Sequence, residues 1–135
     1  MSTDVFEDYL NRMEYEYEVD EENSAIDISA ETADGYAFTV TLVTTRTAYS
    51  LFVCPLVELG KRFEKRALYQ RLLEISDRVR HVKLSVDADG DVKLAAEGFS
   101  RLDAYGQFRR RLEAVVATVE DYGQEIAELA GGELA

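Results

Sequence analysis

Hydrophobic and polar positions along this chain change period several times, and these changes predict its first elements. Apolar side chains recur every three or four positions in residues 5–13, which is the spacing of one helix face. Ser2 or Thr3 is placed to cap this helix at its start. Three segments that alternate apolar and polar residues, as half-buried strands do, follow at 26–30, 36–44 and 48–54.

The second half of the chain predicts a helix, a hairpin and a longer helix. Residues 63–75 again hold helical spacing. Two alternating runs then flank Asp89-Gly90, and this pair favours a hairpin because glycine adopts the positive φ that such turns need. Residues 108–129 hold helical spacing, enough for about six turns.

Smaller signals mark where these elements begin and end. Pro55 ends the strand at 48–54, because proline has no amide hydrogen for a strand ladder. Ser100 and Asp103 have the spacing of a capping box before the long helix. Gly131-Gly132 is expected to stop that helix.

Two segments indicate different positions in the sheet. Glutamates at 14, 16 and 18 alternate with Tyr15, Tyr17 and Val19, which predicts a short edge strand or an extended lead-in. Both faces of the strand at 48–54 are apolar, so we expect it to lie centrally.

These patterns predict an α+β fold, in the order helix, three strands, helix, β-hairpin, long helix. Alternation in the strands means that one sheet face is buried and the other faces water. Helices covering mainly one face of an antiparallel sheet are the arrangement that follows. With 135 residues, 47% hydrophobic content and no linker-like stretch, the chain is expected to form a single domain over residues 1–135.

Charge is spread unevenly along the chain, whose formal net charge is -12. Residues 1–34 hold twelve acids and one base, whereas residues 61–111 hold thirteen bases and eight acids. An acidic chain repels the phosphate backbone, so nucleic acid is not an expected partner. The basic middle is expected to lie against acidic ends of the same chain or of a partner subunit.

The composition also bears on the compartment. No run approaches the roughly 20 apolar residues that span a bilayer, and the N-terminal residues lack a signal-peptide pattern. The single cysteine, Cys54, excludes an internal disulfide and lies in an apolar run. We therefore expect a cytoplasmic protein without membrane contact, with Cys54 as a buried structural thiol.

Two stretches carry a resemblance to a known family. They are residues 67–73, ALYQRLL, and residues 82–94, VKLSVDADGDVKL, followed by the apolar long helix. Together with the order of elements over about residues 3–129, they make the chain resemble the type III secretion chaperone-like fold. More narrowly, the chain is similar to YbjN-type bacterial domains.

The resemblance implies a protein that acts through protein contacts. Members of this fold group dimerise, and the secretion chaperones hold an extended client segment. The role of the YbjN-type group is described as regulatory or sensory. The resemblance implies no enzyme activity or cofactor, and it carries over no catalytic residue.

An acidic string at the predicted hairpin is a weak candidate for a metal site. Asp87, Asp89 and Asp91 form Asp-x-Asp-Gly-Asp, but an EF-hand loop needs glycine at the sixth position and a terminal glutamate at the twelfth. Here glycine stands fourth and an apolar strand begins at Val92. A polar hairpin tip is the favoured interpretation, with a weak divalent-ion site as the alternative.

No catalytic constellation is apparent in the sequence. His81 is the only histidine, so it cannot join a multi-histidine metal cluster, and a Cys–His pair would need Cys54 to meet it. Arg109, Arg110 and Arg111 are the densest basic patch, which we interpret as a solvated face or as ion pairs with Glu113 and the N-terminal acids. Recognition of an acidic partner segment is the alternative for this patch, and Tyr15 and Tyr17 are candidate contacts as well.

Two functional hypotheses follow from the sequence. The first is a non-enzymatic protein-interaction module, chaperone-like or regulatory, that binds a protein segment as a homodimer. The second is a sensor of a small ligand or divalent ion that uses the turn at 87–91 or the sheet face. An enzyme is the least favoured class, because the usual catalytic residue types are nearly absent.

Overall fold

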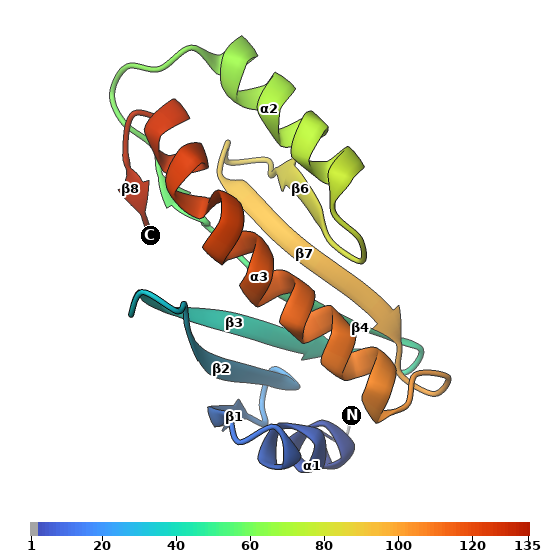
Figure 1. The fold of residues 1–135 in the computed structure, drawn as a ribbon. Helices are drawn as coiled ribbons and strands as arrows, with labels where there is room; N and C mark the ends of the chain where they lie inside the picture. The colour runs from blue at the N-terminus through green and yellow to red at the C-terminus, as the bar shows by residue number, and fades with distance from the viewer. Residues whose placement is uncertain (1–2) are drawn as a thin grey trace.

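A computed structural model describes residues 3–135, which form three helices packed on an antiparallel sheet of six strands (Figure 1). The sheet order is β1-β2-β3-β4-β7-β6. The elements in chain order are α1 (Asp4–Arg12), β1 (Glu16–Asp20), β2 (Ala25–Glu31), β3 (Ala37–Thr44), β4 (Ala48–Val53), β5 (Val57–Glu58), α2 (Lys65–Arg78), β6 (Lys83–Val86), β7 (Val92–Phe99), α3 (Tyr105–Leu129) and β8 (Glu133–Leu134). The predicted α+β order is therefore confirmed, and residues 16–20 form a true edge strand.

The three helices cover one face of the sheet, as the alternation predicts (Figure 1). The α1 side chain of Phe6 lies 5.1 Å from the ring of Tyr49 on β4 and 5.5 Å from Phe108 on α3, measured between ring centroids. Thr3 stands at the N-cap of α1 without a side-chain cap bond, and its hydroxyl donates instead to Glu7 at 3.1 Å. Ser2 lies outside the described residues.

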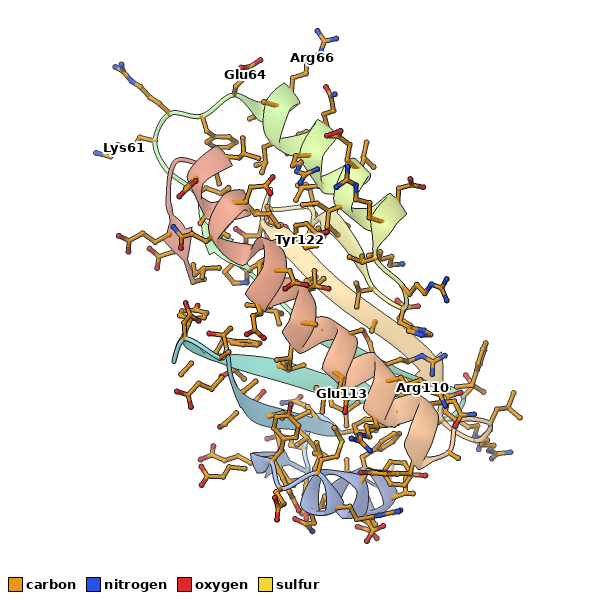
Figure 2. All side chains as sticks on the ribbon, in the orientation of Figure 1. Lys61, Glu64, Arg66, Arg110, Glu113 and Tyr122 are labelled. Atoms are coloured by element: carbon orange, nitrogen blue, oxygen red, sulfur yellow. The ribbon has the colours of Figure 1, made fainter. Side chains whose placement is uncertain are left out.

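α2 is held beside the C-terminal half of α3. The guanidinium of Arg71 donates to both carboxylate oxygens of Glu125, with the Nη2–Oε1 bond at 3.1 Å. The same guanidinium lies 5.9 Å from the ring centroid of Tyr122 on α3, a residue labelled in Figure 2. The hydrogen bond from Arg71 lowers the pKa of Glu125, so this carboxylate stays charged to a lower pH than an isolated glutamate.

A half-buried polar cluster fixes the start of α3 to the sheet. The hydroxyl of Tyr49 donates to Asp103 Oδ2 at 2.7 Å, and Arg111 Nη1 lies 2.8 Å from the same oxygen. Arg111 Nε also donates to the carbonyl of Glu97 at 2.8 Å. Burial, and next the bond to Asp103, raise the pKa of Tyr49 well above its usual range, so this phenol stays protonated and donating.

That cluster corrects the predicted start of the long helix. α3 begins at Tyr105 with Ala104 as its N-cap, and the side chain of Gln107 accepts from the Ala104 amide at 3.1 Å. The capping box expected at Ser100 and Asp103 is wrong, because Asp103 is engaged by Tyr49 and Arg111 instead.

Acidic and basic segments occupy opposite ends of the sheet. The N-terminal acidic segment forms α1, β1 and β2 at one edge, and the basic α2 flanks β6 at the other (Figure 1). Lys61 and Arg66 project away from the molecule at the end that carries α2 (Figure 2). The basic segment meets the acidic C-terminal segment through the pairs of Arg71 with Glu125 and of Arg109 with Glu113.

Candidate protein-interaction surface

The face of the sheet turned away from the helices is here called the open sheet face. One row of directly paired residues crosses all six strands on this face. In strand order from β1 to β6 it consists of Glu18, Asp27, Thr41, Phe52, Ala95 and Lys83. The row is acidic at the β1 side, neutral or apolar in the centre and basic at the β6 side.

The centre of the open sheet face offers apolar area. Phe52 is half-buried, and the ammonium of Lys93 lies 5.1 Å from its ring centroid. Val43 on β3 is also half-buried and pairs with Ser50 on β4. Thr41 and Ala95 are the cross-strand neighbours of Phe52, and aromatic side chains are enriched in protein interfaces.

The two outer strands, β6 and β1, differ in how much of their outer edge is free to pair with another strand. The backbone amide of Leu84 on β6 donates to the Ser76 hydroxyl of α2 at 2.9 Å, so α2 occupies part of that edge. Within residues 3–135, no strand pairs with the outer edge of β1. Its glutamates and Asp20 are exposed, and such charge protects an edge from unspecific pairing.

Exposed apolar side chains extend this surface at the end of β7. Phe99 is 60% exposed and Leu102 is 78% exposed. Together with Thr47 and Arg101 they line a shallow hollow of about 250 Å³. Phe99 pairs with Ala48 at the end of β4, so this hollow continues the open sheet face.

The acidic string at 87–91 is a hairpin turn in the structure. Asp87 Oδ1 accepts the backbone amides of Asp89 and Asp91, both at 2.9 Å. The bond from the Asp91 amide is the main cause that lowers the pKa of Asp87. Among residues 3–135, no three His, Cys, Asp or Glu side chains are grouped so as to hold a metal ion.

We therefore expect Asp87 to matter for stability and calcium to have no effect. Asp87→Ala should lower the free energy of unfolding by about 0.5–2 kcal/mol, as loss of a cap does. The matched change Asp89→Ala should stay within about 0.5 kcal/mol, because that side chain is exposed. Chemical denaturation measures both, and a rise in melting temperature with millimolar calcium would instead favour the ion-sensor hypothesis.

Cys54 is not the buried thiol expected from the sequence. It is half-buried, since it follows the inward-facing Val53, and its thiol donates to Asp87 Oδ2 at 3.5 Å. Burial, followed by the bond to Asp87, raises the pKa of Cys54, so the thiol is a poor nucleophile. Its hydrogen-bond partner is Asp87 and not His81, which is exposed at a positive φ of 70°.

The arginine patch divides among three roles. Arg109 Nε pairs with Glu113 at 2.6 Å, which confirms that part of the expected ion pairing, and Arg111 belongs to the cluster with Asp103. Among residues 3–135, the salt bridges of these arginines go to Glu113 and Asp103 and not to the N-terminal acids. Arg110 is exposed on α3 (Figure 2).

Tyr15 and Tyr17 are less available for contact with a partner than the sequence suggests. Tyr17 pairs with the buried Ile28 and packs against the core, while its hydroxyl donates to Asn11 at 3.1 Å. Tyr15 is half-buried, and burial together with the charge of Glu113 raises its pKa. The glutamates of β1, rather than these rings, face the open side.

The row across the open sheet face was not identified from the sequence. The sequence shows which residues of each strand face away from the core, but the register of five strand pairs is needed to place them in one row. The apolar hollow at Phe99 and Leu102 was also missed, because two isolated apolar residues near a loop carry no periodic pattern.

Comparison with known families decides the classification. Residues 2–128 match the YbjN family, described as "Putative bacterial sensory transduction regulator". The chain belongs to the YbjN family. No curated protein sequence matches this YbjN-family chain. No helix within residues 3–135 is both long and apolar enough to cross a membrane.

Solved structures share the fold of this YbjN-family chain at low sequence identity. One is a chain of the heterodimeric ExoU–SpcU complex from the type III secretion system of Pseudomonas aeruginosa, with a TM-score of 0.61 and 16% identity over 91% of this chain and 95% of that one. Another is a chain of the HopA1–SchA chaperone–effector complex, with a TM-score of 0.60 and 13% identity over 96% and 93%. The structure of YbjN from E. coli has a TM-score of 0.60 and 15% identity over 93% of this chain and 93% of that one. These similarities establish the type III secretion chaperone-like fold.

Proposed function

We propose that this YbjN-family domain is a non-enzymatic protein-binding module that holds an extended segment of a partner protein on its open sheet face and acts as a homodimer. The observation that carries the proposal is the row from Glu18 to Lys83, which crosses six strands on the face opposite the helices. Chains with this fold occur in complexes named as chaperone–effector or type III secretion assemblies, which supports a chaperone-like role.

The charges along the row define the chemistry of the segment. Basic side chains of the partner would lie over Glu18 and Asp27, an apolar side chain over Phe52, and an acidic or polar one near Lys83 and Lys93. Such complementarity fixes the direction of a bound segment and disfavours segments of the opposite polarity. The exposed Leu73 on α2, 71% accessible, is a separate apolar contact that is available for self-association.

Affinity capture from the native lysate, followed by mass spectrometry, tests the proposal. The purified partner is then titrated against the wild-type chain, Phe52→Ala on the open sheet face and Val5→Ala on α1. We expect Phe52→Ala to weaken binding about tenfold, as loss of a central aromatic anchor does. Val5, which is 46% exposed on the other side, serves as the control and should leave the affinity unchanged.

Light scattering on the wild-type chain tests the homodimer in the same preparation. A chain that stays monomeric at tens of micromolar and enriches no partner would contradict the proposal. Equal losses of affinity in the two variants would place the partner elsewhere than on the open sheet face.

A further inference from the structure

The last residues of the chain fold back as β8, which lies beside the C-terminal half of α3 (Figure 1) and pairs with β5. β8 pairs antiparallel with β5, placing Leu134 opposite Val57. The amide of Ala135 donates to the carbonyl of Leu56 at 3.2 Å, and the hydroxyl of Tyr36 donates to the carbonyl of Ala135. Residues 131–135 are here called the tail, and the space that they fill is called the tail groove.

Gly123 shapes the tail groove for an aliphatic side chain. It lies buried inside α3, where glycine is otherwise unfavourable, and a Cβ there would stand 2.9 Å from Leu134 Cδ2. Val57, across the pair from Leu134, is 1% exposed. The missing side chain at Gly123 therefore forms a notch in which the half-buried Leu134 packs against the core.

The close approach of Gly132 to the Glu58 carbonyl determines which residue can stand two positions before the aliphatic residue. A Cβ at Gly132 would overlap the carbonyl group of Glu58, with the carbonyl carbon at 2.8 Å. Only glycine fits at this point. Glu133, between the two, is exposed. The groove thus accepts an extended segment with glycine first, any polar residue next and an aliphatic residue third.

We propose that the tail groove is a second binding site for an extended partner segment of this glycine–polar–aliphatic pattern, and that the tail occupies it as an internal competitor. The inference deepens the proposed function, on which its partner depends. The groove is built from β5 and Gly123, which lie within the family match of residues 2–128, whereas the tail lies beyond it.

The contacts explain how such an occupant can be displaced. The tail contributes a two-residue ladder, the bonds at Ala135 and one aliphatic side chain. A short segment with so few contacts binds weakly, so attachment to α3 keeps it in place at an effective concentration on the order of millimolar. A partner held on the open sheet face gains a comparable advantage when the part of its chain between the two sites is long enough to reach the groove.

The test uses a chain that ends at Ala130 and a synthetic peptide of residues 131–135, Gly-Gly-Glu-Leu-Ala. We expect saturable nuclear magnetic resonance shifts of the Val57 and Gly123 amides at millimolar peptide in the shortened chain, and none in the full chain. A control peptide with aspartate in place of leucine should give no shift. Absence of shifts in a folded shortened chain would overturn the proposal.

A full-length variant keeps the test valid if the shortened chain does not fold. Leu134→Asp keeps every residue of the groove and removes the side chain that fills the notch, so the peptide should bind this variant as it binds the shortened chain. Failure of the peptide to bind a folded Leu134→Asp variant also counts against the proposal.

The same variant separates this inference from the proposed function. Once a partner is captured, Leu134→Asp should raise its affinity several-fold, because the internal competitor is weakened. An unchanged affinity overturns the tail groove as a partner site while the open sheet face stands. If the peptide binds but no partner is captured, the tail groove is supported as a binding site. The proposed function is then contradicted by its own experiment.

Discussion

Replacing Phe108 by alanine is expected to lower the free energy of unfolding by about 3–5 kcal/mol, the usual loss for a fully buried phenylalanine. Phe108 is 0% exposed and stands at the centre of an aromatic cluster. Its ring centroid lies 5.5 Å from those of Phe6 and Tyr9 and 5.7 Å from that of Tyr49. One side chain therefore joins α1, α3 and β4, and its removal leaves a cavity where three elements meet. Equilibrium denaturation by urea measures the change.

Phe99→Ala is the matched control for this experiment. The same atoms are removed, but Phe99 is 60% exposed, so the free energy of unfolding should change by no more than about 0.5 kcal/mol. Comparable losses in the two variants would contradict the packing of α1 and α3 on β4. A Phe108→Leu variant should recover part of the stability, because it restores much of the buried volume.

The second large effect is expected from Gly98→Ala on β7. A Cβ at this position would lie 2.5 Å from the Tyr49 hydroxyl and would also overlap Asp103 Oδ2. Tyr49 cannot turn aside easily, since Phe6 and Phe108 pack against its ring. Overpacking of this kind lowers stability by about 1–3 kcal/mol, and breaking the Tyr49–Asp103 bond adds to the loss. Thermal and chemical denaturation both report the change.

Gly106→Ala should have the opposite sign. Gly106 lies in the first turn of α3, and the nearest atom to an added Cβ is the Arg110 guanidinium at 3.9 Å. Alanine is the better helix former, so a gain of up to about 1 kcal/mol is expected. If both glycine variants were equally tolerated, the close approach at Gly98 could not be the reason that glycine stands there.

The regular elements follow from the sequence because their signals repeat. The alternation in β3 places Phe38, Val40 and Leu42 on the covered face, and all three are buried. The two apolar faces of residues 48–54 correctly predicted a central strand, which lies between β3 and β7. The Asp89-Gly90 turn is confirmed, with Gly90 at a φ of 87°.

What could not be predicted depends on contacts between distant residues. β5 and β8 have two residues each, too few for any period to show, and they pair across most of the chain length. Asp103 has the spacing of a capping residue, but its partners Tyr49 and Arg111 come from other parts of the fold. Cys54 looked buried because its neighbours are apolar, whereas its position after Val53 turns it toward Asp87.

The candidate surface shows the same limit. Each strand contributes polar and small residues to the open side that can be read from the sequence, yet only the register brings Glu18 and Lys83 to opposite ends of one row. In the sequence, the apolar residue of that row, Phe52, contributes only to the second apolar face of residues 48–54, which predicts a central strand. Its exposure depends on the face that the helices leave uncovered.

On the open sheet face, Glu18 and Asp27 stand at the β1 side and Lys83 at the β6 side, so this face carries an electric dipole along the strand-to-strand direction. A charged partner that diffuses toward it experiences a torque before any contact forms, and is turned so that its polarity matches. Added salt screens this torque over a Debye length of about 8 Å at physiological ionic strength. For the proposed complex, we therefore expect the dipole to affect mainly the rate of association and the apolar contacts to affect mainly the rate of dissociation.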